Sequence, residues 1–134
     1  MWTWSQSEGR MYGPTGLLAE GYSGAGEGKN SPNEENVQNV GPIPEGFYDI
    51  EGPIDSPTHG PYALPLLPDA GNAMFGRSGF LVHGDSVERP GNASEGCIIL
   101  PREARESIWN SGDHRLQVVR QVDSIFKSDN DKEP

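Results

Sequence analysis

The chain has only one cysteine and few basic residues, and each shortage excludes a class of protein. One cysteine in 134 residues permits neither an intramolecular disulfide nor a cysteine-based metal cluster. The sum of Lys and Arg is 10 against 20 Asp and Glu, and this argues against nucleic acid as a partner because basic residues must neutralise the phosphates. Hydrophobic residues make up 33% of the chain, enough for the core of one domain.

Long apolar runs are also missing from the sequence. No stretch approaches the roughly 20 apolar residues that a membrane-spanning helix needs. The first residues, MWTWSQ, contain no basic region followed by an apolar one, so they do not form a secretory signal. We therefore expect a chain that is made in the cytoplasm and needs a route other than general secretion to act outside it.

Turn-forming residues are abundant, with 18 Gly and 12 Pro, and they predict a mainly β fold. Strands are expected as a hairpin within residues 1–22, where Trp2 and Trp4 belong to the core, and at residues 47–50, 62–66, 80–83, 97–100 and 116–119. Pro65 cannot donate a ladder hydrogen bond, so the strand at 62–66 is predicted to be an edge strand.

The remaining segments are predicted to be loops, one helix and a tail. Residues 23–40 are rich in Gly, Asn, Ser and Glu and are expected to form a surface loop. Residues 101–110 start with a proline, place Ala104 and Ile108 on one face and end before Ser111-Gly112, as a short helix does. We predict one domain over residues 1–122 and a polar, flexible tail over 123–134.

The only cysteine and one of three histidines lie at the ends of two predicted buried strands. His83 ends one apolar run and Cys97 begins the other. A cysteine attacks an amide carbonyl as its thiolate, so an adjacent imidazole that removes the thiol proton would activate it. Gly96 would allow close approach of a substrate, and the N–H groups of Gly96 and Cys97 could stabilise an oxyanion. The alternative is structural, because unpaired cysteines are commonly buried.

Four other residues could have a functional role, but the sequence around each of them is less specific. Ser94 could bond the imidazole or shape the oxyanion site, and Asp85 could orient His83 or cap the loop. His59 and His114 have no second histidine or carboxylate at ligand spacing in the sequence, so no metal site is expected.

The segment HGDSVERPGNASEGCIIL, residues 83–100, resembles the signature of L,D-transpeptidases of the YkuD type, in which His-Gly is followed after a loop by Ser-x-Gly-Cys. Further similarity, at residues 4–6, 21–24, 29–30, 41–44, 60–61 and 76–80, is to one branch of that superfamily. This branch comprises type VI secretion effectors with L,D-transpeptidase and L,D-carboxypeptidase activity. The resemblance covers roughly residues 2–120.

The resemblance implies a compact β-sandwich or barrel with one short helix after the cysteine strand, and no cofactor. It also implies an acyl-enzyme on Cys97, formed with the tetrapeptide stem of peptidoglycan, and release of the terminal D-alanine. Water would then give carboxypeptidase activity, a free D-amino acid would give exchange, and a second stem would give a cross-link. The sequence does not rank these three outcomes.

The chain departs from the pattern where substrate would bind. Many L,D-transpeptidases have histidine at the position of Glu95 and an arginine associated with the substrate carboxylate at the position of Ile99. Arg77 is the candidate for that carboxylate here, because a guanidinium binds it bidentately, and a structural ion pair is its alternative role. Candidates for the rest of the stem-peptide groove are Tyr22, Ser23, Lys29, Gly84 and Glu95.

The implied setting is the periplasm of a target bacterium. A toxin of this kind is expected to have a cognate immunity protein that covers the Cys97 cleft, and a secretion-system partner for delivery. Two other functions stay open: a Cys/His amidase or endopeptidase that cuts inside the stem, and a non-catalytic module that binds the cell wall.

Overall fold

The fold was determined as a computed structural model, which describes residues 1–122. Its elements, in chain order, are β1 (Trp2–Ser5), β2 (Arg10–Gly13), β3 (Gly16–Glu20), β4 (Tyr22–Ser23), the 3-10 turns η1 (Gly26–Gly28) and η2 (Pro32–Glu34), β5 (Gly46–Ile50), β6 (Ile54–Ser56), β7 (Gly60–Pro68), β8 (Leu81–His83), β9 (Ile98–Ile99), α1 (Arg102–Asn110) and β10 (Arg115–Val119). The mainly β prediction is confirmed. The predicted tail at 123–134 lies outside the described residues.

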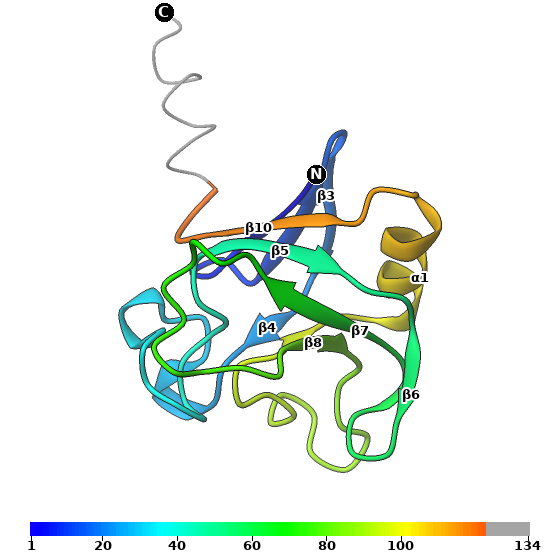
Figure 1. The fold of residues 1–134 in the computed structure, drawn as a ribbon. Helices are drawn as coiled ribbons and strands as arrows, with labels where there is room; N and C mark the ends of the chain where they lie inside the picture. Colours follow the sequence, from blue (N-terminus) through cyan, green and yellow to red (C-terminus); the bar gives the residue numbers. More distant parts are fainter. Residues whose placement is uncertain (123–134) are drawn as a thin grey trace, which may run out of the picture.

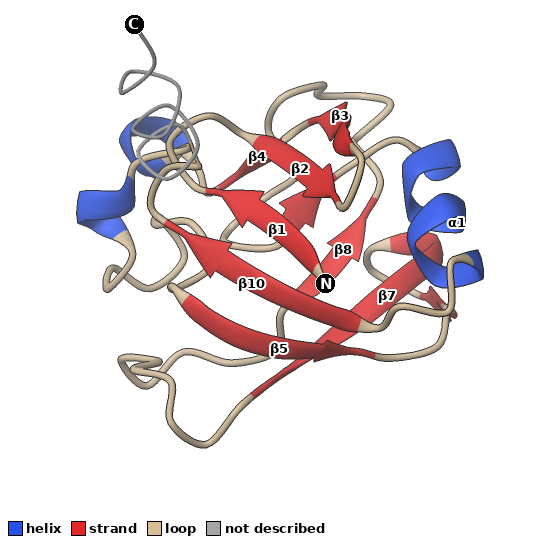
Figure 2. Cartoon of the chain, turned by 90° about the horizontal axis from the view of Figure 1, so that it is seen from above, coloured by secondary structure: helices blue, strands red, loops and turns tan. Residues whose placement is uncertain are grey.

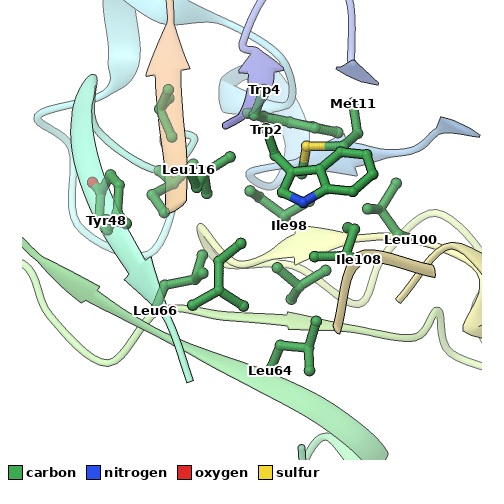
Figure 3. Close-up of a cluster of buried hydrophobic side chains, with 14 of the residues drawn as sticks. Trp2, Trp4, Met11, Tyr48, Leu64, Leu66, Ile98, Leu100, Ile108 and Leu116 are labelled. Atoms are coloured by element: carbon green, nitrogen blue, oxygen red, sulfur yellow. The ribbon is translucent and has the colours of Figure 1, made fainter. Parts of the chain in front are cut away.

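The strands form one sheet in the order β3-β2-β1-β10-β5-β7-β8-β9-β4, and β6 adds to β7. Figure 1 shows β10, β5, β7 and β8 following one another in this order. The sheet curls around a single core, so that residues from opposite ends of the order pack together (Figure 3). The first and last strands of the described chain meet as the parallel pair β1 and β10. Trp2 and Trp4 of β1 are 7% and 0% exposed, which confirms their predicted place in the core.

The predicted helix is confirmed as α1, which packs beside the inner strands β7 and β8 (Figure 2). Pro101 precedes its first turn, where a missing N–H costs nothing. Ala104 and Ile108 are buried on the face toward the core, as their spacing predicts. No helix within residues 1–122 is long and apolar enough to cross a membrane.

The predicted edge position of the strand with Pro65 is wrong. β7 is an inner strand that pairs with β5, β6 and β8 along different parts of its nine residues. The backbone of Pro65 points toward the chain just after Ile50, the last residue of β5 that pairs with β7. There the carbonyl of Pro65 accepts a hydrogen bond from the N–H of Glu51 at 2.8 Å. A proline is tolerated here because this position needs only an acceptor.

The loop at residues 23–40 also differs from the simple surface loop expected. It contains η1 and η2, and Gly24 and Gly28 pack closely against neighbouring backbone. A Cβ at Gly28 would come within 2.1 Å of the carbonyl oxygen of Val40. The segment that follows β4 is therefore closely packed, and it lies close to the loop before Cys97.

Candidate functional site

The parallel pairing of β8 and β9 brings His83 and Cys97 to one face of the sheet. Val82 is paired with Ile98 and His83 with Ile99, so Cys97 lies opposite Leu81. Side chains alternate between faces along a strand, and paired residues point to the same face. His83 and Cys97 therefore share a face, as the sequence predicts from the ends of the two apolar runs.

A second histidine joins this pair from the turn between β6 and β7. One ring nitrogen of His59, one of His83 and the Sγ of Cys97 all lie within 4.8 Å of one another. The rings of His59 and His83 have their centroids 4.7 Å apart. The sequence predicts no metal site at His59, because no second histidine or carboxylate lies at ligand spacing from it. In the folded chain, however, His59 lies beside His83 and Cys97.

The backbone carbonyl of Gly84 determines the tautomer of His83. His83 Nδ1 lies 2.9 Å from this oxygen, and a carbonyl can only accept a hydrogen bond. The proton of the neutral ring is therefore on Nδ1, and Nε2 holds the lone pair. Nε2 is buried and has no hydrogen-bond partner within the described part of the chain. Nε2 is therefore the ring nitrogen that can accept a proton, and His83 has one ring nitrogen within 4.8 Å of Sγ of Cys97.

Both members of the pair are neutral at rest. Burial lowers the pKa of the His83 imidazole, and the bond to Gly84 only partly opposes this. Burial likewise raises the pKa of the Cys97 thiol, although the N–H of Leu81, 3.3 Å from Sγ, favours the thiolate. The geometry thus supports transfer of the thiol proton to Nε2 during attack, in place of a preformed thiolate and imidazolium pair.

Buried hydroxyl groups hold the loop that presents Cys97. Ser94 Oγ accepts bonds from the N–H groups of Gly24 at 2.8 Å and Gly96 at 3.0 Å, and donates to the carbonyl of Cys97 at 2.6 Å. Ser23 Oγ donates to the carbonyl of Gly96 at 2.7 Å. Ser94 therefore positions Cys97 through the backbone, and this replaces the contact with imidazole that the sequence suggested.

Gly96 is required by the same geometry. Its φ of 144° lies in a region that favours glycine, and a Cβ there would approach Arg77 Nη2 to 2.5 Å and the Phe80 ring to 2.8 Å. Its N–H is already bonded to Ser94, so it is not free for an oxyanion. Of the two backbone donors that the sequence suggested, the N–H of Cys97 is the one left for that role.

Arg77 makes structural contacts, which favours the alternative to its expected role in binding a substrate carboxylate. Its side chain is buried, with 5% of the residue exposed. Nη1 donates to the carbonyls of Glu35 and Pro42, and Nη2 donates to those of Gly41 and Glu95. These four bonds use the N–H groups of both terminal nitrogens, which a carboxylate would need for a bidentate contact with them. Its positive charge still lies close enough to Cys97 to favour the thiolate.

Tyr22, Lys29 and Asp85 fasten the loop between β8 and β9. The hydroxyl of Tyr22 donates to Asp85 and accepts from the N–H of Ala93, and Lys29 Nζ donates to the carbonyl of Gly91. Asp85 also accepts from two backbone N–H groups of the loop. Asp85 is thus a loop residue that does not orient His83, and Tyr22 and Lys29 act on the loop from outside the Cys97 cleft.

A cleft of about 340 Å³ opens over Cys97. Its lining, which is mostly polar, includes Gln38, Asn39, Thr58, His59, Ser78, Phe80, His83, Asn92, Glu95 and Gly96. Of the predicted substrate residues, Glu95 lies exposed at this cleft and the buried Arg77 also contributes to its lining, whereas Gly84 lines an adjoining hollow with Arg105. Sequence analysis missed Gln38, Asn39 and Asn92, which come from loops without a recognisable motif.

Comparison with protein families gives one match. The model of the Tlde1 domain matches residues 18–123, which include His83, Cys97 and all the residues that line the cleft. No curated protein and no solved structure has a significant match to the chain. Since the family model covers most of the sequence, the chain belongs to the Tlde1 domain family of type VI secretion effectors that act on the cell wall.

Proposed function

We propose that the chain removes the terminal D-alanine from the tetrapeptide stems of peptidoglycan through an acyl-enzyme on Cys97. The observation that carries the proposal is the state of His83. Its Nδ1 proton is held by the carbonyl of Gly84, its buried Nε2 has no hydrogen-bond partner in residues 1–122, and one of its ring nitrogens lies within 4.8 Å of Sγ of Cys97.

The first half of the reaction is an acyl transfer to sulfur. Nε2 of His83 takes the proton of Sγ as the sulfur attacks the carbonyl that precedes D-alanine. The N–H of Cys97 stabilises the oxyanion. The C–N bond then breaks, and the imidazolium returns its proton to the amine of D-alanine, which leaves as a neutral product. This gives a thioester between Cys97 and the shortened stem.

The second half depends on the acceptor. Water, deprotonated by Nε2, hydrolyses the thioester to a tripeptide stem and restores the thiol. The amine of a free D-amino acid gives an exchanged stem, and the side-chain amine of another stem gives a cross-link. The mostly polar lining of the cleft, with Asn39, Asn92 and Glu95, suits a solvated peptide with charged groups. Hydrolysis and exchange are both within reach of this site.

The effector family supplies the setting of this activity. Delivery into a target cell implies a secretion-system partner for transport and an immunity protein in cells that produce the effector. We infer that the site of action is the periplasm, where the stems are accessible. Trimmed tetrapeptides can no longer serve as donors, so the wall loses cross-links.

The test is mass spectrometry of purified tetrapeptide muropeptides incubated with the protein, with and without free D-methionine. We expect loss of one D-alanine, or its exchange for D-methionine, with the wild type and not with Cys97→Ala. Cleavage inside the stem would replace the proposal with an amidase or endopeptidase. Unchanged muropeptides, together with wall binding by both proteins, would replace it with a binding module.

A further inference from the structure

The three side chains around the cleft floor form a set of metal-ligand atoms. His59, His83 and Cys97 offer two imidazole nitrogens and one thiol sulfur, all within 4.8 Å of one another. A tetrahedral zinc ion with bonds of about 2.0–2.3 Å holds such atoms roughly 3.3–3.6 Å apart. His59 is exposed on a turn, so rotation of its side chain can bring its nitrogen closer to the other two atoms.

The second ring nitrogen of each histidine is already oriented by an oxygen atom. His83 Nδ1 contacts the carbonyl of Gly84 at 2.9 Å, and His59 Nδ1 contacts Thr58 Oγ1 at 2.9 Å and Ser56 Oγ at 3.2 Å. Histidines that bind metal almost always use their other nitrogen in this way, which fixes the ring and its tautomer. Both Nε2 atoms are therefore the ones left for a ligand.

An independent observation comes from the buried lone pair of His83. The residue is 3% exposed, and its Nε2 has no hydrogen-bond partner in the described chain. A buried polar atom without a partner is costly, and a bound cation would satisfy it. At the sulfur, the N–H of Leu81 lies 3.3 Å from Sγ and stabilises the anionic form that metals bind.

We propose that His59, His83 and Cys97 bind one Zn²⁺ ion, with a water molecule as the fourth ligand. Soft thiolate sulfur and imidazole nitrogen in a four-coordinate arrangement favour zinc over magnesium or calcium. The Cys97 thiol loses its proton to solvent as the sulfur–zinc bond forms. The chain's formal charge of -10 favours approach of a cation.

Zinc in this position makes the cleft unreactive toward amides. The ion occupies both the sulfur that attacks and the nitrogen that accepts its proton, so Cys97 can neither be deprotonated by His83 nor form a thioester. The site is thus an inhibitory one, reversed by a chelator. The inhibition of cleavage rests on the proposed function, whereas zinc binding and the shielding of the thiol do not.

The binding experiment titrates the purified, reduced protein with Co²⁺ and then displaces it with Zn²⁺. We expect the thiolate-to-cobalt charge-transfer band and tetrahedral visible bands of a bound Co²⁺ ion, with one equivalent of Zn²⁺ removing both. His59→Ala should weaken Zn²⁺ binding at least about tenfold, because even outer partners of a metal ligand contribute roughly 10- to 100-fold to affinity. His114→Ala is the matched control, since His114 stacks on Trp109 and does not line the cleft.

Two results would overturn the metal site: absence of a thiolate-to-cobalt band in the wild type, or equal Zn²⁺ affinity of the wild type and His59→Ala. The rate of alkylation of Cys97 by iodoacetamide gives a readout that needs no cell-wall activity. Zinc should slow it in the wild type and in His114→Ala, and a chelator should restore it. If zinc shields the thiol while muropeptides stay uncut without zinc, the proposed function fails and the metal site stands.

Where cleavage is observed, inhibition is measured against each variant's own rate without zinc. We expect the zinc concentration for half-inhibition to rise at least about tenfold in His59→Ala, in step with the loss of affinity. Full cleavage by the zinc-saturated wild type would overturn the inhibitory role.

Discussion

The carbonyl oxygen of Gly84 lies 2.9 Å from Nδ1 of His83, and this contact decides which nitrogen of the ring can act as a base. Many catalytic histidines are oriented by a carboxylate, which also stabilises the imidazolium. A backbone carbonyl fixes the tautomer with a weaker charge. The imidazole therefore remains a weak base that stays neutral until a proton is transferred to it.

This relationship predicts the behaviour of His83→Asn. The amide of asparagine can still donate to the carbonyl of Gly84, but it has no nitrogen that accepts a proton. We expect the rate of D-alanine release to fall by about 10²–10⁴-fold, the usual contribution of a general base. The thermal midpoint should change little, because a buried hydrogen bond is kept. The rate is measured by release of D-alanine from tetrapeptide.

His114→Asn is the matched control for that substitution, since His114 lies outside the cleft. It should leave the rate near that of the wild type. A loss in His83→Asn that is matched by an equal loss in the control would contradict a role of His83 as the base.

The pKa shifts predict a broad pH profile for kcat/KM. The pKa of His83 lies below its ordinary value of 6.5 because of burial, and that of the Cys97 thiol lies above its ordinary value of 9.0. Protonated His83 cannot accept a proton, so activity should rise with pH through the lowered pKa and then stay flat across neutrality. An acid limb above pH 6.5 would instead indicate an imidazolium stabilised by the thiolate.

Stability should depend on pH through the same histidine. The unfolded chain has the ordinary pKa and binds a proton on His83 at a higher pH than the folded chain does. The folded state is therefore fully favoured above pH 6.5 and loses stability as the pH falls through the lowered folded pKa. His83→Asn should make the urea midpoint less sensitive to pH in this acid range than His114→Asn does.

The parts of this protein that sequence predicts are those with a local pattern. Apolar runs ending at His83 and starting at Cys97 indicate two buried strands, and their parallel pairing then places both side chains on one face. Pro101 and the spacing of Ala104 and Ile108 likewise indicate α1. Each of these features depends on residues close together in the chain.

The parts that sequence does not predict depend on backbone groups and on distant turns. Every residue has a carbonyl, so nothing in the sequence marks Gly84 as the partner of His83, or Gly41 and Pro42 as partners of Arg77. His59 reaches the cleft only because β6 and β7 form a hairpin whose turn lies beside His83.

Ser94→Ala tests the role of the hydroxyl that holds the Cys97 loop. The substitution leaves the N–H groups of Gly24 and Gly96 without their acceptor in a buried place. Each such loss costs about 1–3 kcal/mol, so we expect a free energy of unfolding lower by at least about 2 kcal/mol. Urea denaturation measures it. Ser78→Ala, at an exposed serine of the same cleft, should change stability by less than about 0.5 kcal/mol.

Arg77→Lys separates a structural arginine from one that binds substrate. A lysine keeps the charge, but its single ammonium group cannot reach the four carbonyls that the guanidinium fork contacts. We expect a loss of at least about 3 kcal/mol in the free energy of unfolding, because several bonds from a buried charge are broken. Arg102→Lys is the matched control, since Arg102 is exposed on α1, where it bonds Glu106 and lies over the ring of Tyr62. An unchanged denaturation midpoint with a raised KM for tetrapeptide would restore Arg77 to the substrate carboxylate. A lowered midpoint with KM unchanged in the folded fraction assigns it to the scaffold behind Cys97.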